Sequence, residues 1–181
     1  KRQPLLNEPD QSYGGAIWAD AVPQLTGANI PFVIRLRVVL LRDLGAPLSP
    51  FNAFQIIQGL ETVGLRMKQH CSNAEKVVEF LNSHKKVKNV IYSTNHQGVV
   101  LERAKKYLKG GNGALVGIDL GTVEAGAKFI NNLKMLYHVA NIGDARSLAI
   151  HPASTTHSQL TPEEQLAAGV TPGYVRLSIG I

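Results

Sequence analysis

The feature that most constrains this fold is a long amphipathic pattern over residues 61–84. Apolar residues recur there at intervals of three and four, with charged and other polar residues between them. This spacing predicts one long helix that buries a single apolar stripe. Its length suits an element joining two domains, so we expect it to connect residues 1–60 with residues 85–181.

Beyond residue 84 the pattern becomes an alternation of short strands and short helices with connections of mixed length. Strands are predicted at 87–92, 114–120, 136–140, 147–150 and 174–179, and helices at 99–108, 123–133 and 162–168. Such alternation indicates an α/β layer, with a small mixed sheet of about four strands and helices on one face.

The region before the long helix has a different texture. Residues 1–30 are rich in Gly, Pro and Asn and predict a long irregular connection with one short helix near 16–21. Apolar residues at helical spacing predict a helix over 32–44. A Ser-Pro pair, which favours an N-cap followed by a first helical residue, opens another helix over 49–60.

Composition narrows the function classes. Hydrophobic residues make up 44% and charged residues 18%, which is typical of a globular protein. No apolar run approaches the roughly 20 residues that a membrane span requires. The net charge of +6 suggests nucleic-acid binding as a possible function. The basic residues, however, form small groups without interleaved aromatics, so we interpret them as solvent-exposed surface charges. The single cysteine, Cys71, excludes an internal disulfide and favours the cytoplasm.

Both ends are unusual for a free-standing domain. The chain opens in a polar, proline-bearing stretch and closes inside the apolar alternation of residues 174–181. Native domains seldom end on an interior strand. We therefore expect part of a longer protein.

Arg176 is the residue most suggestive of chemistry. It lies inside an apolar strand, where a guanidinium is costly to bury unless it meets an anion. Its planar fork suits a carboxylate held by two hydrogen bonds. Residue types alone leave a ligand anion and a structural ion pair equally supported.

Other polar candidates have simpler interpretations. Asn141 follows a strand and could orient a ligand, although a turn role is favoured. His151 and His157 match no zinc spacing, so loop hydrogen bonds to backbone are expected and no metal site is predicted. Cys71 is expected to be a small core residue, and residues 110–113 a loop rather than a phosphate cradle.

Five segments of the sequence, in this order, together form a pattern typical of one enzyme family. The chain resembles the Cys/Met-metabolism enzymes that use pyridoxal 5′-phosphate (PLP), and within them most closely the O-acetylhomoserine sulfhydrylases. The segments that carry the resemblance are Leu44–Thr62, Leu65–His70, Ala140–Asp144, His151–His157 and Val175–Gly180.

This resemblance implies the C-terminal part of a fold-type-I, aspartate-aminotransferase-like enzyme. Residues 1–60 would end the large PLP-binding domain, 61–84 would form the interdomain helix, and 85–181 would form a C-terminal α/β domain truncated at its end. It also implies a cytoplasmic homotetramer, with no nucleic-acid or membrane partner.

The resemblance further implies that Arg176 binds the substrate carboxylate, with Asn141 nearby, and that the 151–157 loop lines the substrate entrance. The cofactor-binding residues are not assigned. No lysine here has the family's Ser-x-Thr-Lys-like context, so no catalytic residue is expected in this chain. The Schiff-base lysine would lie upstream, in a missing N-terminal domain, and the chain alone would be inactive.

The implied reaction of the parent enzyme is a γ-replacement in methionine biosynthesis, in which O-acetyl-L-homoserine and sulfide give homocysteine. Two alternatives remain open. One is another family member, either a cystathionine γ-synthase or a methionine γ-lyase. The other is a non-catalytic, truncated interaction domain.

Overall fold

The computed structural model describes residues 3–181 and divides the chain into two compact units. The first unit ends at Gln58, and the second runs from Gly59 to Ile181. The boundary falls near the end of one helix, and each unit is described by itself. The domain limits expected at residues 60 and 84 stay predictions.

The named elements in the described part of the first unit, residues 3–58, are all helices, and one isolated antiparallel bridge joins Asp10 to Ala16. Its elements are α1 (Pro4–Asn7), η1 (Gln11–Tyr13), α2 (Trp18–Thr26), α3 (Pro31–Arg35), the π-helical η2 (Leu36–Asp43) and α4 (Pro50–Glu61), which crosses the boundary. Within residues 3–30, the predicted irregular connection is therefore more helical than expected. Trp18 and Val22, one turn apart on α2, are both buried. The packing of these two side chains stabilises the helix although it contains Pro23.

A small aromatic and acidic cluster holds the first unit together. The Trp18 indole Nε1 donates to Asp10 Oδ2 at 2.9 Å, and the Tyr13 ring packs edge-on against the indole with centroids 4.7 Å apart. The Tyr13 hydroxyl also bonds the carboxylate of Asp43, at the end of η2. These contacts tie the start of the unit to the end of its helical run.

The helix predicted over 32–44 is confirmed in extent, as α3 continuing into η2. It stops before Gly45, whose φ of +64° is strained for other residues. The N-cap is also confirmed, because Ser49 Oγ accepts from the Asn52 amide at 3.1 Å. The π-helical winding of η2 has no counterpart in the prediction.

The long amphipathic helix is present as α5 (Val63–Ser83). Its buried stripe consists of His70, Cys71, Ala74, Val78 and Leu81, which follow the three- and four-residue spacing of the pattern. Cys71 is 8% exposed, so its assignment as a core residue is confirmed.

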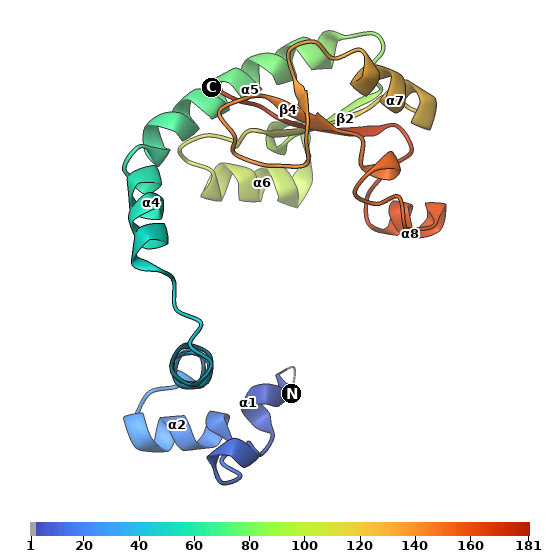
Figure 1. Cartoon of the computed structure of the whole chain (residues 1–181). Helices are drawn as coiled ribbons and strands as arrows, with labels where there is room; N and C mark the ends of the chain where they lie inside the picture. The colour runs from blue at the N-terminus through green and yellow to red at the C-terminus, as the bar shows by residue number, and fades with distance from the viewer. Residues whose placement is uncertain (1–2) are drawn as a thin grey trace. The chain divides into compact units, whose positions relative to one another are not determined.

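The rest of the second unit is a mixed α/β layer (Figure 1). Its elements are β1 (Asn89–Ile91), η3 (Ser93–Asn95), α6 (Gly98–Tyr107), β2 (Leu115–Asp119), α7 (Val123–Asn131), β3 (Tyr137–His138), β4 (Leu148–Ile150), η4 (Pro152–Ser154), α8 (Pro162–Ala167) and β5 (Tyr174–Ser178). The sheet has five strands in the order β1-β2-β5-β4-β3, one more than the approximate count predicted. Only β3 and β4 pair in parallel.

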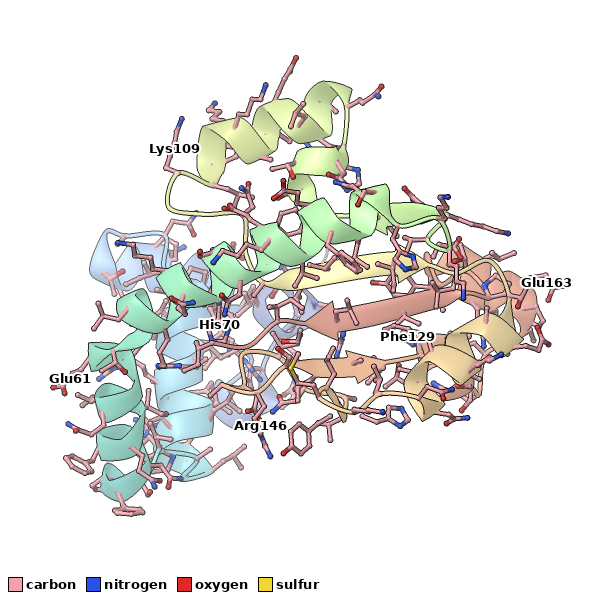
Figure 2. All side chains as sticks on the ribbon, turned by 90° about the horizontal axis from the view of Figure 1, so that it is seen from above. Glu61, His70, Lys109, Phe129, Arg146 and Glu163 are labelled. Atoms are coloured by element: carbon pink, nitrogen blue, oxygen red, sulfur yellow. The ribbon has the colours of Figure 1, made fainter. Side chains whose placement is uncertain are left out.

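One face of this sheet forms the core. Val116 and Ile118 of β2 pair with Leu177 and Val175 of β5, and all four side chains are fully or almost fully buried. They pack with α5 and α7, which lie over the strands when the sheet is viewed from above (Figure 2). Phe129 of α7, labelled there, packs against this core. The other face carries the alternate residues of each strand.

The end of β5 is fixed to α5 by two side chains. His70, 2% exposed, donates from Nδ1 to the Ile179 carbonyl at 2.7 Å, and the Asn73 amide donates to the Gly180 carbonyl at 3.0 Å. Gly180 also lies against the 145–147 segment, where a Cβ would stand 2.3 Å from the Ala145 carbonyl oxygen. Only glycine fits that position.

No single helix within residues 3–181 is long and apolar enough to cross a membrane. One pair of helices, α2 and the helical run Pro31–Asp43, is together long and apolar enough by length and composition alone, but the two are bent by 100° relative to each other.

Candidate functional site

Arg176 stands at the centre of the sheet, on the face opposite α5 and α7. It is the third residue of β5 and pairs with Gly117 of β2 on one side and Ile150 of β4 on the other. Because neighbours along a strand alternate between faces, Arg176 points away from the core formed by Val175 and Leu177. Its half-buried side chain can therefore reach a ligand on this second face.

Among residues 3–181, the Arg176 guanidinium has one hydrogen-bond partner, a backbone carbonyl. Nη2 donates to the Asn141 oxygen at 3.4 Å. Within residues 3–181, no carboxylate oxygen lies within 4.0 Å of this guanidinium. The structural ion pair, one of the two interpretations of Arg176, thus lacks a partner in the described part of the chain.

The structure brings Asn141 to Arg176, but through its main chain. The Asn141 side-chain oxygen instead accepts from the Ile142 amide at 2.9 Å, which is the turn role that sequence favoured. Its contribution at this site is a carbonyl that orients one arm of the guanidinium.

The loop that supplies this carbonyl is anchored at both ends. The Gly143 amide donates to Ser178 Oγ at 3.4 Å, which links the loop to β5. Asp144 forms two side-chain hydrogen bonds with Arg146, at 2.9 and 3.1 Å, and these lower the pKa of Asp144 to about 2. The Arg146 guanidinium also lies 4.8 Å above the Tyr137 ring.

Tyr174 and Gly117 are site residues that the sequence reasoning missed. The Tyr174 ring lies over the Gly117 backbone, where a Cβ would meet ring atom Cε2 at 2.6 Å and the hydroxyl at 3.1 Å. Burial raises the pKa of Tyr174, and the nearby Arg176 charge opposes that rise. The period-two alternation that places residues 174 and 176 on one face was the signal available.

The two loop histidines serve the fold. His151 is 1% exposed, and its Nε2 donates to the Pro172 carbonyl at 2.8 Å while Nδ1 lies 2.8 Å from Ser154 Oγ. This confirms the expected backbone bond for His151. His157 instead pairs with the Thr156 hydroxyl at 2.9 Å. Among the described residues, no group of three or more His, Cys, Asp or Glu side chains could hold a metal ion.

The glycine-rich segment 110–113 is a loop leading to β2, as expected. Gly111 has φ of +141°, and a Cβ there would lie 2.7 Å from Cys71 Sγ. The loop therefore packs closely on α5 at this point. This contact accounts for the glycine, and no phosphate-binding role is needed to explain it.

A cavity of about 690 Å³ lies on the other face of the sheet, between the end of α5 and α7. Leu81, Ile118 and Phe129 are among its apolar lining residues, and Lys86 and Lys128 are among its basic ones. The sheet separates it from Arg176, so it is not part of the same site.

The residues around Arg176 suit a carboxylate and do not suit attachment of PLP. Strands β2, β4 and β5 and the loops at 139–147 and 151–157 contain no lysine, the residue that forms the Schiff base with this cofactor. Every lysine within residues 3–181 is solvent-exposed. The basic side chain that this face contributes is the Arg176 guanidinium.

Comparison with known proteins places the chain in a family. The model of the Cys/Met metabolism PLP-dependent enzymes matches residues 12–181. The chain belongs to this family. The predicted family membership is therefore confirmed, and the match extends over both structural units.

Two relatives with different activity names match over the same share of their own length. An O-acetyl-L-homoserine sulfhydrylase of Leptospira meyeri is 51% identical over 97% of this chain and 41% of its own length. An L-methionine gamma-lyase of Fusobacterium nucleatum is 43% identical over 90% of the chain, again 41% of that protein.

A solved structure confirms the fold class. It is a putative O-acetylhomoserine (thiol)-lyase from Campylobacter jejuni, described with N′-pyridoxyl-lysine-5′-monophosphate, and it superposes with a TM-score of 0.79 at 42% identity. The match covers 98% of this chain and 41% of that one. The chain thus spans about two fifths of the length of the relatives it matches.

Proposed function

We propose that this chain carries the substrate-carboxylate site of a PLP-dependent O-acetylhomoserine sulfhydrylase. The reaction is a γ-replacement that converts O-acetyl-L-homoserine and sulfide into homocysteine for methionine biosynthesis. The observation that carries the proposal is the half-buried Arg176 guanidinium, which lies in the central strand of the sheet without a carboxylate partner in the described chain. The family and the sulfhydrylase relatives support it.

Arg176 binds the α-carboxylate of the amino-acid substrate in this proposal. The guanidinium offers five N–H donors in a planar fork, and within the described chain only one of them meets a protein acceptor, the Asn141 carbonyl. The free edge can therefore hold both oxygens of a carboxylate. Bidentate binding fixes the rotation of the substrate about its carboxyl group, which aligns the reacting carbons with the chemistry.

The cofactor is held outside these residues. PLP supplies an electron sink in enzymes that bind it. We infer that its Schiff-base lysine belongs to a large N-terminal domain, for which the greater length of the relatives leaves room. The 181 residues alone are then inactive. A cytoplasmic homotetramer is part of the same proposal and rests on the family resemblance.

Visible absorption tests whether PLP is bound by the N-terminal domain rather than by these 181 residues. The purified chain, mixed with PLP and then dialysed, is expected to be colourless and to form no homocysteine from O-acetyl-L-homoserine and sulfide. A polypeptide that also includes the N-terminal domain is expected to absorb in the visible, to shift on addition of O-acetyl-L-homoserine, and to form homocysteine. Retention of a substrate-sensitive yellow band by the 181 residues alone would contradict the proposal.

A methionine γ-lyase is the second candidate, because a γ-lyase matches this chain at 43% identity. Both enzymes need the same carboxylate clamp, so Arg176 does not separate them. Product assays do. Homocysteine formation that requires added sulfide supports the sulfhydrylase, and thiol release from methionine without any added thiol supports the lyase.

A further inference from the structure

Arg176 is bounded on two sides by different kinds of group. On the β4 side, the Asn141 carbonyl accepts from Nη2. On the β2 side, the residue directly opposite in the register is Gly117, which has no side chain of its own. A side chain at residue 117 would normally stand beside Arg176 on this face.

The space above Gly117 is filled by Tyr174. A Cβ at residue 117 would approach the Tyr174 Cε2 to 2.6 Å and the Ile91 Cβ to 3.1 Å. The ring thus starts two residues before Arg176 on the same strand and lies across the position opposite it. Because residues two apart on a strand share a face, the Tyr174 ring and the aliphatic stem of Arg176 are neighbours on this side of the sheet.

We propose that Tyr174 is a positioning residue for the carboxylate site, its ring seated over Gly117 and bounding Arg176 on the side away from Asn141. The inference rests on the proposed function only in that the anion is a substrate carboxylate. The ring restricts the stem to the rotamers that bring Nη2 to the Asn141 carbonyl, so the fork is oriented before the anion arrives. The hydroxyl has no required part in this.

Order of the guanidinium in the 181-residue chain is the first readout, and it is independent of catalysis. NMR relaxation of the Arg176 Nε–H group is expected to report restricted motion in the wild type and in Tyr174→Phe. Tyr174→Ala removes the ring and is expected to leave the group flexible on the ps–ns timescale. Tyr107→Ala, on an exposed ring of α6, is the matched control and should leave the Arg176 signal unchanged.

A second variant separates positioning from loss of the fold. Gly117→Ala keeps the ring but displaces it, and it should also mobilise Arg176 while the amide signals of β2 and β5 stay dispersed. An Arg176 group that is equally ordered in Tyr174→Ala and in the wild type overturns the inference. So does a Tyr174→Phe variant that behaves like Tyr174→Ala, because the hydroxyl would then be responsible.

Kinetics of the enzyme that includes the N-terminal domain provide the second readout. Tyr174→Ala is expected to raise KM for O-acetyl-L-homoserine about two- to tenfold, the cost of ordering one long side chain on binding, with kcat changed less. Tyr174→Phe should restore KM. If Arg176→Ala raises KM but Tyr174→Ala does not, the positioning role fails and the proposed function stands. If Arg176→Ala leaves KM unchanged, the proposed function itself fails.

Discussion

At the scale of single residues, Arg176 differs from the arginines that form ion pairs, because it has no carboxylate partner in the described chain. Arg42 and Arg146 bond the neighbouring carboxylates of Asp43 and Asp144. Arg176 instead donates to a backbone carbonyl and shares its sheet face with the Tyr174 ring. A half-buried guanidinium without a carboxylate partner in the described chain is suited to bind an anion from solution.

Replacing Arg176 should therefore weaken substrate binding. Arg176→Ala, in the enzyme that includes the N-terminal domain, is expected to raise KM for O-acetyl-L-homoserine by an amount worth about 2 to 5 kcal/mol. Arg176→Lys keeps the charge but loses the planar fork, so it should recover only part of the loss. Steady-state kinetics of the three forms measure this, and Arg103→Ala on exposed α6 is the control.

Tyr92 gives the fold an alkaline limit. It is 3% exposed, donates from its hydroxyl to the Gly113 carbonyl at 2.8 Å, and its burial raises its pKa from 10.0 to about 12. The folded state therefore disfavours the phenolate. The contribution of the neutral Tyr92 phenol to the free energy of unfolding is fully present below pH 10 and is lost as the pH rises from 10 to 12.

Urea unfolding at pH 9 and pH 12 tests this. The wild type should lose about 2 kcal/mol more stability over that interval than Tyr92→Phe, which cannot ionise there. Replacing the exposed Tyr107 by Phe is the matched control and should preserve the wild-type slope. Parallel pH curves for wild type and Tyr92→Phe would show that the buried phenol is not responsible.

At the scale of elements, helix α7 is held to the sheet by a close contact at Gly126. A Cβ there would lie 2.5 Å from the His151 Cδ2 atom. His151 cannot move aside easily, because it is buried and both ring nitrogens have partners. The missing side chain thus lets α7 approach the loop that follows β4.

Two helical glycines should consequently respond in opposite directions to alanine. Gly126→Ala is expected to destabilise the chain by about 1–3 kcal/mol through overpacking. Gly59→Ala, in α4 with nothing within 4 Å of the new Cβ, is expected to stabilise it by about 0.5–1 kcal/mol through helix propensity. Thermal or urea denaturation of both variants checks the signs, and equal effects would contradict this account.

At the scale of the whole chain, burial is distributed unevenly between the two units. The buried core residues of the described chain lie almost entirely in the second unit, whereas the first buries only Trp18 and Val22. Apolar burial is the main favourable term in folding. The first unit is thus the less stable by itself.

Trp18 permits a direct test, since it is the only tryptophan in the sequence. In urea, its fluorescence should change at a lower denaturant concentration than the amide NMR signals of β2 and β5 disappear. Two separate midpoints indicate units of unequal stability. Coincident midpoints would mean that the 181 residues unfold as one cooperative body.

Sequence reasoning predicted the elements better than their pairings. The stripe of α5 and the strand containing Arg176 follow directly from periodicity. Strand order and the ring of Tyr174 over Gly117 depend on contacts between distant residues, which no local pattern contains. The missing carboxylate partner of Arg176, which separates its two interpretations, is likewise a tertiary property.

The position of β5 has a consequence for how the chain is made. It is the last of the five strands in sequence but pairs with both β2 and β4, which have no direct pairing with each other. While the ribosome has released only the residues before Tyr174, the two halves of the sheet have no strand between them and their facing edges remain unpaired. The sheet face that holds Arg176 is therefore assembled last, and a stall in translation before β5 would leave two exposed sheet edges available to chaperones or to aggregation.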